Sequence, residues 1–298
     1  MTISAKIIKH STSPEGQEII TFELEYPRFI HAEVMTHRVF SRNAQSSRAV
    51  PVKNTLAVNS KPVEPLVWGK NKAGMSSTEV LEGFKLLVAK ATWSVGAWVA
   101  KKVSGVLNWA GLHKQWANRG TEPYSRIKVI LTTTEIENFY WLRLEKEAAQ
   151  PEIIALAEAM QKVHKESKPS MLFPGQWHLP YVDTIEVGSK QYYFSDANEV
   201  SLEQAQKISA SCTAQVSYRK LDTSIEKAIA IYGRLFSGPK PHLSPTEHQA
   251  TPIFAGGMTM RTYTWPAGVT HVDRKMKPWS GNLKGWIQFR QLIDIKGT

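Results

Sequence analysis

The segment of residues 36–48 constrains this chain more than any other. It reads THRVFSRNAQSSR, with three arginines, one histidine, one asparagine and three serines. Arginine forms forked hydrogen bonds with phosphate and carboxylate groups, and the hydroxyl and amide groups add orientable donors and acceptors. A solvated basic loop is the alternative, but these charges alternate with Ser, Asn and Gln and have no Asp or Glu beside them. We therefore expect a multiply charged partner: a nucleotide, a cofactor or nucleic acid.

Composition predicts a folded, basic protein. The 298 residues are 42% apolar and 21% charged, and the formal net charge is +11, which favours anionic partners. The single cysteine, Cys212, excludes an internal disulfide or a thiolate-rich zinc site, and we expect it to be a small buried hydrophobe. Lysines interrupt the longest apolar run, 89–106, and the N-terminus lacks the apolar stretch of a secretory signal. We expect a soluble cytoplasmic protein.

The pattern of strands and turns predicts a hairpin at the N-terminus. Residues 3–9 and 17–26 are rich in strand-forming side chains, and Ser-Pro-Glu-Gly lies between them. A further strand is expected at 126–131, and a loop followed by a strand at 171–187. Residues 49–75 are rich in Pro, Lys, Asn and Gly and predict an irregular loop.

Apolar periodicity and capping residues predict several helices, at 78–107, 112–118, 134–144, from 150 onward, 201–214 and 224–236. Ser76 with Glu79 and Thr134 with Glu137 are read as capping pairs, and Pro151 as a first-turn proline. The expected fold is α/β (α+β), with a mixed or antiparallel central sheet and several helices. Without a linker-like tract, we expect one domain over 1–298 with an inserted helical region at about 76–110.

Three further segments carry polar residues of interest, and each has a structural alternative. In 110–123, Arg119 ends a short helix, where a cation also suits the helix dipole. Residues 138–143 form an amphipathic helix with core aromatics. In 242–248, two histidines and a glutamate flank a Ser-Pro turn, but the spacing matches no zinc-protease pattern, so we expect no metal. Capping of a helix by Ser244 is the simpler interpretation.

Together these segments resemble the flavin-dependent thymidylate synthase family. Residues 36–48 match its signature, Arg-His-Arg-x-x-Ser-x-Asn-x-x-Ser-x-Arg, except for Thr36. Shorter family elements resemble 118–123, 138–143, 149–153 and 242–248. In the family, the element like 214–248 precedes the signature, so the resemblance implies a circularly permuted order, which is tolerable when chain termini lie close together.

The resemblance implies the activity and its residues. Family members are homotetramers that bind FAD across subunits and transfer a one-carbon unit from methylenetetrahydrofolate to C5 of dUMP, with NADPH as reductant. By resemblance, FAD would contact His37, Arg38, Asn138 and Ser244. The nucleotide would contact Glu33, Gln45, Ser46, Ser47, Arg48, Arg119 and Arg143, and Arg143 would also act catalytically by polarising the pyrimidine.

Departures from the family pattern lead to two hypotheses. Thr36 replaces an arginine and Ala44 an acidic residue, Glu33 stands where a glutamine is expected, and Thr132 and Gln215 replace an asparagine and an arginine. Glu33 would accept a hydrogen bond from the amino group of cytosine, which favours dCMP. Separately, Gln288 and Arg290 near the C-terminus would replace the missing arginine.

The primary functional prediction is conversion of dUMP to dTMP. The alternatives are C5 methylation or hydroxymethylation of dCMP or dUMP and, in another class, a basic non-catalytic nucleic-acid-binding protein that uses its ten tryptophans for stacking. The expected partners are a nucleotide and further copies of the chain; a membrane is not expected, and nucleic acid is disfavoured.

Overall fold

Two long antiparallel strands form the centre of the molecule. They are β1 (Ser4–Thr12) and β2 (Glu18–Pro27). In the turn between them, the amide of Gly16 donates to the carbonyl of Ser13 at 2.9 Å. Gly16 has a φ of 80°, which glycine adopts without a steric penalty. The predicted hairpin is confirmed.

The structure is a computed structural model, and the residues that it describes are 3–53, 61–73, 79–147, 149–188, 190–217, 221–253, 271–272, 278–279 and 281–293.

Within these residues, the central sheet has five strands in the order β3-β4-β2-β1-β5. The added strands are β3 (Ser41–Ala44), β4 (Arg126–Thr133) and β5 (Ser170–Met171). All neighbours are antiparallel except β1 and β5, so the expectation of a mixed sheet is confirmed. Strand β3, which lies inside the segment 36–48, was not predicted, because its polar sequence lacks the residues that favour strands.

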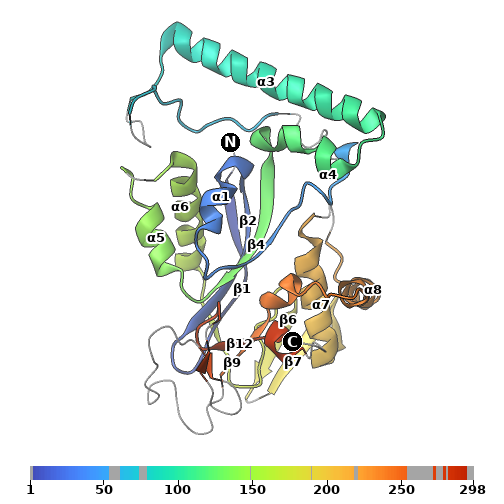
Figure 1. Cartoon of the computed structure of the whole chain (residues 1–298). Coiled ribbons are helices and arrows are strands. Elements are labelled where there is room, and N and C mark those ends of the chain that lie inside the picture. Colours follow the sequence, from blue (N-terminus) through green and yellow to red (C-terminus); the bar gives the residue numbers. More distant parts are fainter. Residues whose placement is uncertain are drawn as a thin grey trace.

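Helices α5 (Glu137–Arg143) and α6 (Pro151–Glu166) lie together on one side of the sheet (Figure 1). Pro151 opens α6, as predicted. The main core lies between these helices and alternate residues of β2 and β4; it includes Ile20, Phe22, Leu24, Val129, Leu131, Phe139, Ile153, Leu156 and Met160.

Two predicted helix caps are wrong. Helix α5 begins after Ile136, and the Thr134 hydroxyl instead accepts a hydrogen bond from the amide of Lys284 at 2.9 Å. Helix α3 (Gly83–Trp109) begins after Glu82 without a side-chain cap, later than the sequence predicts. Glu79 therefore precedes the helix, and Ser76 lies outside the described residues.

A second group of elements packs around a separate apolar cluster. It contains β6 (Asp183–Val187), β7 (Lys190–Ser195), β8 (Asn198–Val200), α7 (Leu202–Ala214) and α8 (Ile225–Phe236). Ser201 and Ser224 cap the two helices, so these helix starts are confirmed. Cys212 is buried in this cluster, and burial raises its pKa to about 12, which confirms its expected role as a small hydrophobe.

A buried chain of side-chain hydrogen bonds joins the central sheet to the C-terminal half. His178 lies between Ser11 of β1 and Thr21 of β2, at 2.9 Å from each hydroxyl. Thr21 contacts Thr132 of β4 at 2.7 Å, and Thr132 contacts the Nδ1 of His248 at 2.8 Å. The family resemblance expects an asparagine near the flavin at position 132. The Thr132 hydroxyl instead makes hydrogen bonds with buried side chains of the protein.

Helix α3 lies across one end of the sheet, beside α4 (Lys114–Ala117) and the 3₁₀ helix η2 (Arg119–Tyr124) (Figure 1). At Gly96, an added Cβ would lie 2.7 Å from the Tyr124 hydroxyl oxygen, so any larger residue would require the Tyr124 side chain to move. No described helix is long and apolar enough to span a membrane.

The remaining elements are short: η1 (Arg28–Ile30), α1 (His31–Met35), η3 (Gln215–Ser217), η4 (Ser244–Glu247), β9 (Ala250–Pro252), β10 (His271–Val272), β11 (Pro278–Trp279), β12 (Trp286–Gln288) and α9 (Phe289–Leu292).

Candidate active site

The segment 36–48 runs along the edge of the central sheet. It leaves α1, forms the outer strand β3 and ends in a turn beside β4. Arg42 holds the first bend, because its Nη1 donates to the carbonyl oxygens of Val34, Met35 and His37 at 3.1–3.3 Å. This guanidinium has a structural role that the motif alone did not reveal.

His37 and Arg143 meet at the start of this segment. The Nε of Arg143 donates to the Nε2 of His37 at 3.0 Å, and its Nη2 donates to the Thr36 hydroxyl at 3.2 Å. The His37 ring is buried between Phe40, which stacks on it, and the edge of Phe139. The sheet edge and α5 therefore place together two residues that lie about a hundred positions apart in the sequence.

The histidine in this pair is neutral at physiological pH. Burial lowers the pKa of His37 to about 4, with smaller contributions from the positive charges of Arg143 and Arg42. A neutral imidazole can accept a hydrogen bond from a guanidinium, whereas a protonated one cannot. The Nη1 of Arg143 has no hydrogen-bond partner among the described residues, so it can donate to a ligand.

Glu33 belongs to the same group of residues. Its backbone carbonyl accepts the Thr36 hydroxyl at 2.6 Å. Burial raises the pKa of its carboxyl group, and the nearby Arg143 opposes this change. Glu33 and Arg143 are thus close enough to interact electrostatically, as expected for two groups that contact one base.

The turn that follows β3 is held by its backbone. The Gln45 amide donates to the carbonyl of Lys128 at 2.8 Å, and Arg28 donates to the Gln45 carbonyl at 3.1 Å. The buried Asn118 donates to the carbonyl of Ser47 at 2.8 Å. The Arg48 guanidinium makes no hydrogen bond within the described part of the chain. Ordered backbone with an outward guanidinium suits an anionic ligand.

Arg119 is paired rather than free. Its Nη1 donates to the Glu122 carboxylate at 3.1 Å, and the side chain is half exposed. Arg28 lies close enough to both residues to interact with them electrostatically. Burial lowers the pKa of Arg28, the negative charge of Glu122 raises it, and the positive charge of Arg119 lowers it. The sequence did not indicate that Arg28 supports this turn, because only strand pairing brings it to Gln45. Asn118 could have been identified as a supporting residue, because it adjoins Arg119.

The residues expected to hold FAD are not joined directly to one another. Arg38 and Asn138 are exposed, and their side chains make no hydrogen bond to described residues. Ser244 is also exposed and opens η4, whose N-cap is Leu243, so the predicted Ser244 cap is wrong. Pro245 follows it in the first turn of η4.

The C-terminal segments return to the signature strand. The Nε2 of Gln288 donates to the Ser41 hydroxyl at 2.9 Å and to the Glu247 carbonyl at 2.8 Å, and Arg290 forms an ion pair with the Glu247 carboxylate. The Asn43 amide lies between the carbonyl oxygens of Thr213 and Ser244. Replacement of the missing arginine by Gln288 and Arg290 stays a prediction.

Gln215 has a purely internal set of contacts. It is buried and holds Asp222 through both backbone groups, at 2.8 and 3.1 Å. The arginine that the family resemblance expects at this position is therefore replaced by a residue that stabilises the turn after α7.

The available donors fit FAD, the cofactor that the resemblance implies. A dinucleotide carries a diphosphate and several carbonyl groups, which need cations and neutral donors. Arg38 and Asn138 present such donors without hydrogen-bond partners among the described residues. His37, which precedes Arg38, is neutral and buried.

These observations define a mixed α/β protein with several arginine side chains at the edge of its sheet. The sequence matches the family described as "Thymidylate synthase complementing protein" over residues 3–170. The chain therefore belongs to this family of enzymes. The match ends before residue 214, so equivalence of 214–248 to the displaced family element remains a proposal, supported by the packing of η3 and η4 against β3.

Comparison with other proteins adds two solved structures. The chain is similar to the UMP/dUMP methylase PolB from Streptomyces cacaoi bound with 5-Br dUMP, with 16% identity over 57% of this chain and 91% of that chain and a TM-score of 0.41. The structure of the same protein bound with 5-Br UMP gives 16% identity, 57% and 90% coverage and a TM-score of 0.44. No protein with a curated description matches the sequence.

Proposed function

We propose that this enzyme transfers a one-carbon unit from methylenetetrahydrofolate to C5 of a pyrimidine deoxynucleoside monophosphate, with dUMP as substrate and dTMP as product. The observation that carries this proposal is the Arg143–His37 pair, held by the signature segment with a free Nη1. A guanidinium at the pyrimidine edge stabilises the negative charge that develops as C5 attacks an electrophile.

The other residues divide between two ligands. The nucleotide is bound by Gln45, Ser46, Ser47, Arg48 and Arg119. The two guanidinium groups donate hydrogen bonds to its phosphate. FAD is held by His37, Arg38, Asn138 and Ser244. When bound, the flavin is reduced by NADPH and supplies hydride to the transferred carbon. Since flavin carries the redox chemistry, no thiol nucleophile is needed, which agrees with the buried, unactivated Cys212.

The test is a visible absorption spectrum of the full-length protein with FAD, followed by addition of dUMP. We expect a flavin spectrum that changes with the nucleotide, and release of tritium from [5-³H]dUMP only with methylenetetrahydrofolate and NADPH. The mass of the product separates methylation from hydroxymethylation. Absence of flavin binding together with steeply salt-dependent DNA affinity would instead support the nucleic-acid-binding alternative.

A second candidate substrate, dCMP, is favoured by the position of Glu33 beside Arg143. If the Glu33 carboxylate accepts the cytosine amino group, Glu33→Gln lowers affinity for dCMP about tenfold relative to dUMP, because a charge-assisted hydrogen bond is lost. Isothermal titration with both nucleotides measures the ratio. Glu137→Gln, an exposed carboxylate on α5, is the matched control. Preference of the unaltered protein for dUMP would exclude dCMP.

We also propose that residues 1–298 form one domain that assembles as a homotetramer. Along α3, nine large apolar side chains are exposed, and their spacing of three, four or seven residues places them on one face: Phe84, Leu87, Val88, Val95, Trp98, Val99, Val103, Val106 and Trp109. In the proposed tetramer, this apolar face of α3 packs against a second copy of the chain.

The double substitution Val95→Glu with Val99→Glu is expected to dissociate the assembly, because it places two carboxylates on the apolar face. Light scattering coupled to size exclusion measures the mass. Ser94→Glu adds the same side chain beside this face and should leave the mass unchanged. A monomeric unaltered protein would contradict the proposal.

A further inference from the structure

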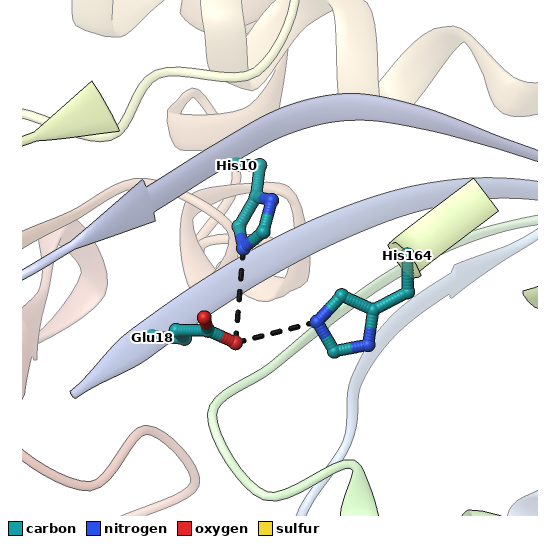
Figure 2. Close-up of side chains that lie close together, drawn as sticks. All are labelled: His10, Glu18 and His164. Carbon is teal, nitrogen blue, oxygen red and sulfur yellow. Dashed lines mark hydrogen bonds and ion pairs between the residues drawn. The ribbon is translucent and has the colours of Figure 1, made fainter. Parts of the chain in front are cut away.

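Two histidines and one glutamate converge where the hairpin meets α6 (Figure 2). His10 comes from β1, Glu18 from β2 and His164 from α6. The Nε2 of His164 lies 3.3 Å from the Oε2 of Glu18, and the Nε2 of His10 lies 3.8 Å from the same oxygen. The three atoms are all within 4.8 Å of one another.

The other nitrogen of each ring has its own partner. The Nδ1 of His10 lies 3.0 Å from the Ser167 hydroxyl, and the Nδ1 of His164 lies 3.4 Å from the Tyr140 hydroxyl. If each Nδ1–H donates there, each Nε2 carries a lone pair directed at Glu18. This arrangement is typical of metal-binding histidines, whose second nitrogen is fixed by an outer hydrogen bond.

One nitrogen of the cluster is buried without a hydrogen bond. The His10 side chain is 3% exposed, and its Nε2 has no hydrogen-bond partner among the residues that the structure describes. A carboxylate and two imidazole lone pairs that face one another repel unless a positive charge lies between them.

We propose that His10, Glu18 and His164 bind a divalent transition-metal ion of the zinc class. Metal–ligand bonds of about 2.0–2.1 Å in a tetrahedron place ligand atoms about 3.3 Å apart, close to the separations of 3.3 and 3.8 Å. Small side-chain rotations bring the third pair into range. The sequence did not predict this site because the three residues follow no local motif.

The site leaves one coordination position open. The Glu18 side chain is 45% exposed and also lines an open hollow of about 280 Å³ with residues 133–137. Solvent and the ion can enter from this side. With three protein ligands, a water molecule fills the fourth position, and the ion fastens the hairpin to α6.

Zinc binding to the chelator-treated, full-length protein tests the proposal. Isothermal titration with Zn²⁺ should show one site, and bound Co²⁺ should give the visible absorption of a tetrahedral ion. Glu18→Gln and His164→Gln should each weaken Zn²⁺ binding about 100-fold or more, and Ser167→Ala about tenfold, since outer partners contribute less than ligands. At the same Zn²⁺ concentration, the melting temperature should rise in the unaltered protein and much less in Glu18→Gln and His164→Gln.

His113→Gln, which removes a histidine outside the cluster, should bind Zn²⁺ as the unaltered protein does. Circular dichroism of each variant without metal shows that it is folded, and both ligand substitutions avoid the deeply buried His10 for this reason. Equal Zn²⁺ affinity in all variants, or no saturable site in the unaltered protein, would overturn the proposal. The flavin and nucleotide assays are independent of either outcome.

Discussion

Replacement of Arg143 by lysine is expected to lower kcat by about 10²-fold with little change in folding. In the structure, the planar guanidinium contacts His37 and Thr36 at the same time and still has Nη1 available. A lysine ammonium is a compact charge that cannot reproduce this fork. Loss of one group that stabilises developing negative charge typically costs two to three orders of magnitude in rate.

Tritium release under saturating dUMP, folate and NADPH measures this effect. Arg234→Lys on α8 is the matched control, because the Nε of Arg234 donates to the Ala230 carbonyl of its own helix. A kcat for Arg143→Lys within threefold of the unaltered enzyme would contradict the catalytic assignment.

A second readout separates this role from a structural one. Because the charge of Arg143 contributes to the lowered pKa of His37, Arg143→Ala should raise that pKa. The titration of His37 can be followed by NMR. An unchanged His37 pKa would show that the two side chains do not meet in solution.

The protein should lose stability as the pH falls from about 6.5 toward 3. Burial lowers the pKa of His248 to about 3, and that of His178 also lies well below its ordinary value. The unfolded chain takes up protons near pH 6.5 that the folded protein does not bind, so stability is present above this pH and is lost below it. His248 alone accounts for about 3 kcal/mol between pH 6.5 and 4.

Urea unfolding at a series of pH values measures this loss. His248→Gln keeps a group that can hydrogen bond Thr132 but cannot titrate, so its free energy of unfolding should fall less steeply between pH 6.5 and 4. His113→Gln, at the exposed start of α4, should keep the full slope. An equal slope in all three proteins would contradict the assignment.

Local sequence signals succeeded where the relevant contacts are local. Ser201 and Ser224 cap their helices, and Pro151 opens α6, because each acts within one turn of its own helix. Thr134 and Ser244 have equally suitable side chains, yet neither caps a helix: α5 begins after Ile136, and Ser244 is itself the first residue of η4. A suitable cap residue therefore does not decide where a helix begins.

The sequence by itself determined the hairpin and the family, since these depend on residue type and short spacing. Only the tertiary structure decided that His37 accepts from Arg143, that Arg28 holds Gln45 and that His10, Glu18 and His164 converge. The physical reason is that strand pairing and helix packing join residues far apart in the chain, and burial then sets their protonation.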